Sequence, residues 1–333
     1  MSYESAIVRK ALARLERRRD NRDRRRFQLE RSLYGMEPRL REIDLTLRGT
    51  MADLALLAAG GRPVAPDGPE IAAIRARNEA LQAERTRLLA QLGYAPDALD
   101  DVPACPRCGD TGWREGRMCS CLKELCAQEQ LKALTEAMSL TDEQDFSRLT
   151  LDIYSGQPWG SQDRSPRENM QRIVAVCAGY ARQFPGYPLQ NLLLSGSTGL
   201  GKTFLSGCIA REVTLRGFSV VYDTANSIFD TFFKTRRFSL EAEEQRQAQT
   251  DTRRYLNCDL LILDDLGSEH TMPSTRASLY GLVDSRLQTK RHTIISSNLS
   301  TREIGEKYGA QLASRVEGLY RELTFYGDDL RLQ

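Results

Sequence analysis

Hydrophobic and polar positions follow two different patterns along the chain. In residues 5–102, apolar side chains recur at spacings of three and four, which is typical of amphipathic helices. From residue 190 onward, short apolar runs alternate with stretches of helical pattern, and this alternation indicates a parallel sheet flanked by helices. The chain is therefore predicted to join a helical N-terminal region to an α/β domain.

The N-terminal helices form the first part of this prediction. Residues 5–33 read as a strongly basic helix with a thin apolar stripe, and helical spacing resumes at Leu40 and continues to about Ala59. Gly60–Gly68 holds two prolines and predicts a turn. After the turn a heptad seam follows, made of Ile71, Ile74, Asn78, Leu81, Arg85, Leu88 and Leu92. Asn78 and Arg85 are polar interruptions that can fix register, and the two helices predict an antiparallel coiled-coil hairpin.

The C-terminal part alternates strands and helices. A helix is expected from Ser165 to about Gln183, after a linker. The expected strands are 191–195, 219–222, 260–263 and 293–297, and the helices between them are 204–214, 226–234 and 274–288. This order is that of an α/β P-loop ATPase with a parallel sheet.

A complete G-x-x-x-x-G-K-T phosphate loop follows the first of these strands. The predicted nucleotide-binding residues are Gly196, Ser197, Thr198, Gly199, Leu200, Gly201, Lys202 and Thr203. The glycines let the backbone turn its N–H groups toward the phosphates, and the following helix offers its N-terminus. Lys202 is expected to reach the β- and γ-phosphates, and Thr203 to ligate Mg²⁺. A chance match in a glycine-containing turn is the alternative, which the strand–loop–helix context disfavours.

Two carboxylates end the apolar strand 260–263. Ligands of open α/β sheets bind at the carboxyl ends of strands, where Asp264 and Asp265 lie. Asp264 is expected to hold Mg²⁺ directly or through water, and Asp265 to act as general base on the attacking water. The alternative is a pair of solvated loop carboxylates.

Five of the eight cysteines lie within residues 105–126. Two close pairs with a glycine-rich loop between them suit tetrahedral zinc, and the predicted ligands are Cys105, Cys108, Cys119 and Cys121. Cys126 is a spare that could replace Cys121. Free reduced thiols and a redox C-x-x-C motif are the alternatives. The remaining cysteines are scattered, so the pattern is no disulfide framework, and we expect a structural site in a reducing compartment.

Charge is distributed unevenly. The net charge is only +2, but residues 1–41 hold thirteen Lys/Arg against six Asp/Glu, a local excess of +7. The cluster comprises Arg17, Arg18, Arg19, Arg22, Arg24, Arg25 and Arg26. Nucleic-acid binding and a solvated helix face are both consistent with it. No run of eighteen apolar residues and no secretory h-region is present, so a cytoplasmic protein without a membrane partner is expected.

These patterns divide the chain into four predicted regions. Residues 1–102 form a basic helical and coiled-coil region, and residues 103–128 form a zinc-binding module. A linker follows at 129–160, and the ATPase domain occupies 161–333.

Residues from about Phe146 to Arg331 resemble the bacterial helicase-loader family of DnaC/DnaI type, within the AAA+ ATPases. The matching segments are Ser165–Asn169, Asn191–Ser206, Cys258–Gly267, Thr293–Ser300, Ser314–Arg315 and Gly327–Arg331. By this resemblance Asn298 corresponds to sensor 1, Arg315 to an arginine finger that acts on a neighbouring subunit, and Arg331 to sensor 2. Surface salt bridges are the alternative for both arginines.

The resemblance also implies partners. Loaders of this family grip single-stranded DNA in the ATP form, hold the replicative helicase hexamer through the N-terminal region, and self-associate through the AAA+ domain. The cysteine segment resembles the zinc-containing, Gram-positive-like subgroup. We expect Phe229–Arg237 to contact single-stranded DNA, since it joins Phe232 and Phe233 to Lys234, Arg236 and Arg237. An IstB-like transposition-helper ATPase and an ATP-bound scaffold with incidental hydrolysis remain alternative functions.

Overall fold

The computed structural model describes residues 3–59, 68–138, 144–236, 241–270 and 272–332. The chain divides into two compact units, one formed by Leu12–Cys119 and the other by Met1–Ala11 together with Ser120–Gln333. Most of the predicted turn at Gly60–Gly68 lies outside the described residues. No helix in the described ranges is long and apolar enough to cross a membrane.

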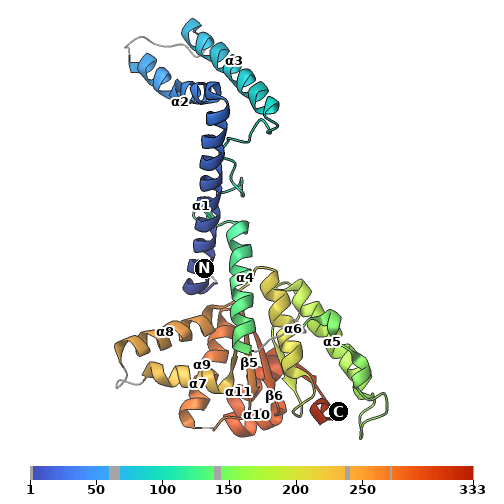
Figure 1. Ribbon diagram of the computed structural model, residues 1–333. Coiled ribbons are helices and arrows are strands. Elements are labelled where there is room, and N and C mark those ends of the chain that lie inside the picture. Colours follow the sequence, from blue (N-terminus) through green and yellow to red (C-terminus); the bar gives the residue numbers. More distant parts are fainter. Residues whose placement is uncertain (1–2, 60–67, 139–143, 237–240, 271, 333) are drawn as a thin grey trace. The chain divides into compact units, whose positions relative to one another are not determined.

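The first unit contains three long helices, α1 (Ser5–Met36, whose first turns belong to the second unit), α2 (Pro38–Ala59) and α3 (Pro69–Gln91) (Figure 1). Helices α2 and α3 pair in opposite directions. Arg39 Nε lies 2.9 Å from Glu84 Oε1, while farther along α2 Thr50 Oγ1 accepts from Asn78 Nδ2 at 3.0 Å. The predicted antiparallel hairpin is confirmed, and the polar seam residue Asn78 does find a partner on the opposite helix.

A small core closes the base of the hairpin. It is formed by Leu33, Leu40, Leu89 and Leu99, all nearly inaccessible to solvent. Beside it, Arg85 donates to Asp44 Oδ1 at 2.8 Å, so the second polar seam residue also pairs across the helices. Because both charges are largely shielded from water and hydrogen-bonded, this pair specifies the register of α2 against α3.

The second unit is built on a parallel five-stranded sheet. Its strands are β3 (Leu192–Ser195), β4 (Val220–Thr224), β5 (Leu260–Leu266), β6 (His292–Ser297) and β7 (Arg321–Thr324). Their order in the sheet is β4-β5-β6-β3-β7. The helices are α4 (Ser120–Met138), α5 (Pro166–Gln183), α6 (Lys202–Leu215), α7 (Ala225–Arg236), α8 (Ala242–Asn257), α9 (Pro273–Gln288), α10 (Thr301–Tyr308) and α11 (Ala310–Leu319).

Helices cover both faces of this sheet (Figure 1). Leu192 and Leu194 of β3 face a core shared with α5 and α6, whereas Leu193 faces a second core shared with α9, α10 and α11. Alternate strand residues thus pack into opposite layers, as expected of a parallel sheet buried on both sides. The predicted α/β fold with a parallel sheet is confirmed.

The segment between the cysteines and the ATPase domain packs on the sheet layers. Leu134 of α4 and Tyr154, which follows the short helix Leu151–Ile153, are buried in the same core as α5 and α6. One boundary between the two compact units lies between Cys119 and Ser120. None of the boundaries between the four regions predicted from the sequence falls at this point.

A fully buried arginine joins the amino ends of β5 and β6. Arg286 of α9 donates to the carbonyl oxygens of Tyr255, Cys258 and His292, and its Nε donates to Thr293 Oγ1 at 3.0 Å. These bonds satisfy carbonyls that precede β5 and the carbonyl of the first residue of β6, and they compensate for burying the charge. Strands β5 and β6, which carry Asp264 and Asn298 at their carboxyl ends, are thereby held together at their amino ends.

Candidate nucleotide-binding site

The loop 196–201 connects β3 to the first turn of α6. Gly201 precedes the helix in the left-handed region, with φ of 93°, and Gly196 has φ of 135°. A side chain at Gly196 would also place its Cβ 2.2 Å from the carbonyl oxygen of Phe325. Backbone conformation and close approach both require glycine there, and the resulting turn leaves the N-terminus of α6 open toward the loop, as an anion site needs.

Lys202 is folded into the loop that precedes it. Its side chain is buried, and Nζ donates to the carbonyl oxygens of Gly196 and Ser197, both at 2.6 Å. Burial lowers the pKa of Lys202, while the nearby Asp264 and Asp265 oppose this shift. An ammonium group held between loop carbonyls and two carboxylates is placed to exchange those partners for phosphate oxygens, so the residue fits the predicted role.

Asp264 is buried and accepts two side-chain hydrogen bonds. Thr203 Oγ1 and Tyr222 Oη donate to Asp264 Oδ2 at 3.1 Å and 2.5 Å. Burial and the neighbouring Asp264 raise the pKa of Tyr222, so its hydroxyl keeps its proton and acts as donor. Thr203 and Asp264 supply hard oxygen ligands side by side, which is the donor chemistry that Mg²⁺ prefers.

Asp265 differs from Asp264 in both exposure and backbone. It is exposed and has φ of 55°, at an irregularity in the pairing of β5 with β6 between Leu263 and Leu266. This is an uncommon conformation for a residue other than glycine, and such residues concentrate at functional sites. The turn separates the two carboxylates, leaving Asp264 buried in the sheet and Asp265 accessible to water.

Asn298 directly follows β6, the strand that lies between β3 and β5. It contacts the segment after the acidic pair, since a Cβ on Gly267 would lie 2.5 Å from Asn298 Oδ1. Glu269 holds the same segment, accepting from the Gly267 amide at 2.9 Å and from the Tyr308 hydroxyl. The structure thus brings the phosphate loop, the acidic pair and Asn298 to one edge of the sheet.

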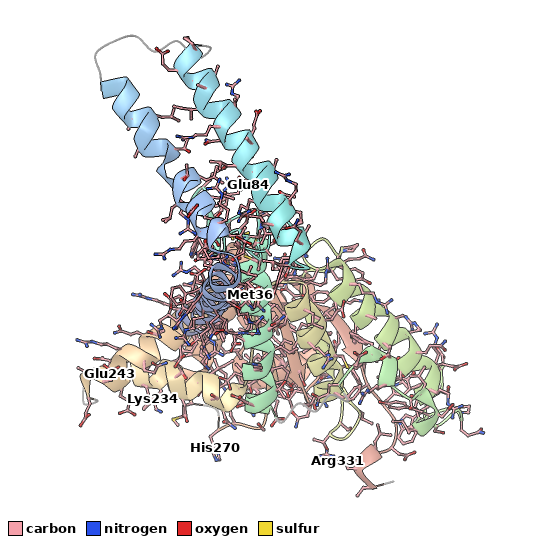
Figure 2. All side chains as sticks on the ribbon, turned by 45° about the horizontal axis from the view of Figure 1, so that its top comes forward. Met36, Glu84, Lys234, Glu243, His270 and Arg331 are labelled. Carbon is pink, nitrogen blue, oxygen red and sulfur yellow. The ribbon has the colours of Figure 1, made fainter. Side chains whose placement is uncertain are left out.

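The C-terminal segment lies against the phosphate loop. The Leu330 amide donates to the Gly199 carbonyl at 3.1 Å, and the Asp329 carboxylate occupies the space that a side chain on Gly199 would need. Arg331 Nε donates to Asp329 Oδ1 at 3.2 Å. Arg331 therefore belongs to the neighbourhood of the loop, although it is exposed at the surface of its unit (Figure 2).

Arg315 has its partners elsewhere. Its Nε donates to Asp284 Oδ1 at 2.8 Å, and its guanidinium lies 4.5 Å from the ring centroid of Tyr280. Both partners belong to α9, and the hydrogen bond to Asp284 raises the pKa of Arg315. Among the residues that the structure describes, no contact joins Arg315 to the phosphate loop of its own chain.

The four predicted zinc ligands are brought together. The Sγ atoms of Cys105, Cys108, Cys119 and Cys121 all lie within 4.8 Å of one another, and those of Cys105 and Cys119 are 3.8 Å apart. Tetrahedral thiolates at a Zn–S distance of about 2.3 Å have sulfurs about 3.8 Å apart, so the arrangement is compatible with zinc. Cys126 is fully buried in α4 and is not a member of this cluster; burial raises its pKa to about 11.

The first cysteine knuckle is fixed by a buried carboxylate. Asp110 Oδ1 accepts from the Cys105 amide at 2.8 Å, and Asp110 Oδ2 accepts from Arg22 Nη1 at 2.5 Å. The Gly109 amide donates to the Cys105 carbonyl at 2.9 Å. Such outer hydrogen bonds orient ligands at metal sites, so Asp110 and Arg22 would orient Cys105 if the cluster holds a metal.

The predicted DNA-contacting segment lies on α7. Phe229 and Phe232 pack against the sheet core, and the Phe232 ring stacks on Tyr255 with centroids 6.4 Å apart. Phe233 is exposed and lines a cavity of about 290 Å³ with His270 and Met272. Lys234, the next residue of α7, is labelled in Figure 2. Phe232 is partly buried with its ring stacked on Tyr255, so the structure favours Phe233 over Phe232 as the exposed ring of this segment. Arg237 and the Arg236 side chain lie outside the described residues.

Four site residues escaped the sequence reasoning. Two of them donate hydrogen bonds: Tyr222 to the Asp264 carboxylate, and Tyr154 Oη to the Leu200 carbonyl at 3.3 Å. The other two are carboxylates: Glu269 accepts from the Gly267 amide, and Asp329 lies against Gly199. Only Tyr222 carried a signal, because it sits near the carboxyl end of a predicted strand. Asp329 and Tyr154 reach the loop from segments far along the chain, and Glu269, although close to Gly267 in sequence, belongs to no motif.

Comparison with known proteins agrees with this site. Residues 171–316 match the model of the IstB-like ATP binding protein family. Over 149 residues the chain is 28% identical to the replicative helicase loader DnaC of Escherichia coli (strain K12), a stretch that covers 45% of this chain and 58% of that protein. It is also 27% identical over 154 residues to the chromosomal replication initiator protein DnaA of Campylobacter fetus, covering 46% of this chain and 34% of that protein.

Among solved structures, a crystal structure of the DnaC helicase loader aligns with 54% of this chain and 98% of its own, at 19% identity and a TM-score of 0.42. The chain spans just over half the length of the curated loaders that it matches. The sequence similarity and the parallel sheet with its phosphate loop confirm the predicted resemblance to DnaC-type AAA+ ATPases over the ATPase region. No comparison bears on the predicted zinc-containing subgroup, which stays a prediction.

Proposed function

We propose that this protein is an ATP-dependent loader of a replicative DNA helicase and that it binds single-stranded DNA in its ATP state. One observation carries the proposal: a complete set of ATPase residues meets at one sheet edge, in a region similar to replicative helicase loaders. The set comprises Lys202, Thr203, Asp264, Asp265 and Asn298.

The geometry supports a division of labour among these residues. Lys202 and the loop amides would bind the phosphates, and Thr203 and Asp264 would hold Mg²⁺, which would supply charge neutralisation at the phosphate oxygens. Asp265, exposed and turned away from Asp264, takes the proton of the attacking water, and Asn298 orients that water. Tyr222 positions the Asp264 carboxylate by donating to it.

The partner assignments follow from the loader proposal. The helical hairpin of α2 and α3 provides the surface for the helicase hexamer, the AAA+ region provides self-association, and the protein works in the cytoplasm. These partner assignments are tested by a pull-down from the native host that is probed for the replicative helicase and for a transposase. Recovery of the helicase is the expected result; recovery of a transposase instead would favour the transposition-helper alternative.

Hydrolysis distinguishes a loader from a scaffold. A loader should hydrolyse ATP faster when single-stranded DNA and the helicase are added, since these complete its working assembly. An ATPase rate that stays flat with and without DNA and helicase would contradict the loader and favour an ATP-bound scaffold.

Single-stranded DNA binding should depend on the exposed end of α7. Changing Phe233 and Lys234 together to alanine removes a stacking ring and a phosphate partner, so we expect affinity for an oligothymidine strand in the presence of ATP to fall at least tenfold. Lys132→Ala on α4 also removes one exposed lysine and serves as the control. Fluorescence anisotropy at several salt concentrations measures both. Equal affinity and salt dependence in the double variant and the control would exclude this surface.

The cysteine cluster should hold one zinc ion per chain. Converting Cys105 and Cys108 together to serine removes two of four thiolates, so we expect the metal to be lost and the fluorescence of Trp113 in this segment to change. Cys126→Ala should retain the zinc, because Cys126 lies outside the cluster. Metal analysis of protein purified under reducing conditions decides the matter; no zinc in the unaltered protein would refute the assignment.

A further inference from the structure

One face of α1 carries positive charge without any carboxylate. Within residues 14–31, steps of one and three place a set of polar side chains on one side of the helix. This arginine face consists of Arg14, Arg17, Arg18, Asn21, Arg24, Arg25, Gln28 and Arg31. At 1.5 Å per residue the face is about 26 Å long.

The helix sorts its arginines into two groups. Arg22 and Arg26 point to another side and bind Asp101 at 3.2 Å and 3.3 Å, and Arg22 also binds the buried Asp110. On the arginine face, Arg18, Arg24, Arg25 and Arg31 are exposed, and within the described part of the chain none of these four has an ion pair. The acidic residues of this stretch, Glu16, Asp20, Asp23 and Glu30, border the face or lie opposite it.

Such an arrangement is unfavourable for the helix alone. Arg17 and Arg18, and then Arg24 and Arg25, lie on the same exposed side with no carboxylate among them, and like charges gathered on one side of a helix repel one another. Arg22 and Arg26 already make the ion pairs to Asp101 and Asp110. A structural role of this kind therefore does not explain why the exposed residues of the arginine face are also arginines. A polyanionic ligand would relieve the repulsion, and it would gain the bidentate hydrogen bonds that guanidinium groups make with phosphates.

We propose that the arginine face binds the sugar–phosphate backbone of double-stranded nucleic acid without reading its sequence. A duplex carries one negative charge per about 1.7 Å of axis, so a 26 Å stretch offers on the order of fifteen phosphates to the face. Asn21 and Gln28 lie between the arginines and add side-chain donors for further phosphate or sugar oxygens.

The composition of the face selects this ligand over others. Single-strand binding relies on a series of stacking aromatic rings, and here one aromatic residue, Phe27, borders the face. Protein interfaces centre on buried apolar or aromatic anchors, and a membrane-surface helix needs an apolar face; the arginine face contains no apolar residue. This nucleic-acid site lies in the helical unit and requires no ATP, so it goes beyond the proposed loading function.

The test uses the whole 333-residue chain without nucleotide, which separates this site from the ATP-dependent one. A labelled 30-base-pair duplex of mixed sequence is titrated by fluorescence anisotropy between about 50 and 300 mM KCl. Arg18, Arg24 and Arg25 are changed together to glutamine, which keeps helix propensity. The matched control changes Arg41, Arg75 and Arg87 of α2 and α3 to glutamine, removing the same charge from other exposed positions.

We expect the face variant to bind at least tenfold more weakly near 100 mM salt. The slope of log K against log salt should become shallower by about 2.7, since each lost phosphate contact contributes about 0.9. The control should keep the slope, and circular dichroism should show equal helix content in all three proteins. Equal losses in the face variant and the control would overturn the proposal, because net charge alone would then explain binding.

Two further ligands complete the test. A single strand of the same length, without ATP, should be bound less tightly than the duplex and should lose less affinity in the face variant. Polyglutamate should bind weakly to all three proteins. A loss for polyglutamate as large as that for the duplex would mean that the face accepts acidic polypeptides, and it would overturn the assignment to nucleic acid.

Discussion

Replacing Lys202 with alanine should abolish ATP binding, whereas Asp265→Asn should keep ATP binding and lose turnover. The buried ammonium of Lys202 is held inside the phosphate loop and contacts phosphates in the ground state, so its removal acts on affinity. Asp265 is exposed beside the loop and acts on the attacking water only during reaction. We expect a decrease of about 10²- to 10⁴-fold in kcat for Asp265→Asn, the range of a lost general base.

Isothermal titration with a slowly hydrolysed ATP analogue and a phosphate-release assay separate these two effects. Asp328→Asn, which changes an exposed carboxylate of the nearby C-terminal segment, controls for the general loss of negative charge. Equal ATP affinity in the unaltered protein and in Lys202→Ala would contradict the assignment of the loop. An Asp265→Asn variant with full turnover would remove Asp265 from the role of base.

Arg315→Ala should bind ATP normally and lose hydrolysis that depends on assembly. Arg315 of α11 contacts Asp284 and Tyr280 of α9, and in the described ranges no contact joins it to the phosphate loop of its own chain. An arginine supplied by a neighbouring subunit would complete the charge stabilisation of the transition state, and such arginines contribute about 10³- to 10⁵-fold. Specific activity of the unaltered protein should accordingly rise with protein concentration, or with DNA or helicase as template.

Mixing two inactive proteins tests this shared site. In a mixed assembly of Arg315→Ala and Lys202→Ala, the nucleotide of an Arg315→Ala subunit can face the intact Arg315 of its neighbour. Recovery of activity on mixing is expected. If no activity returns under conditions where mixed assemblies are shown to form, Arg315 acts only within its own subunit, for example through its salt bridge to Asp284.

Local signals accounted for the parts of the fold and site that could be predicted. The run 191–195 and the loop after it are contiguous, and so is the strand that ends at Asp264, so spacing alone located them. The heptad after Pro69 likewise predicted a helix that pairs with the preceding one, and Asn78 and Arg85 do contact α2.

Elements with weak patterns were missed. The edge strand β7 has one buried residue among its four, Leu323, and the polar helix α8 buries only Ala248 and Tyr255, so neither has a strong hydrophobic signal. Site contacts that join distant segments were also beyond sequence reasoning. Asp329 reaches Gly199 across 130 positions of the chain, a juxtaposition that only the folded sheet creates. The sequence did not distinguish Phe232 from Phe233, because a Phe–Phe pair on a helix does not reveal which ring turns toward the core.

Helicase loading is the activity proposed for this protein. The direct measurement incubates the replicative helicase hexamer of the native host with closed circular single-stranded DNA, ATP and this protein, and then counts helicase rings retained on the circles after a high-salt wash. We predict that retention requires this protein and ATP and is lost with Lys202→Ala. Retention that is the same without this protein, or unchanged by Lys202→Ala, would contradict the proposal that this ATPase loads a helicase.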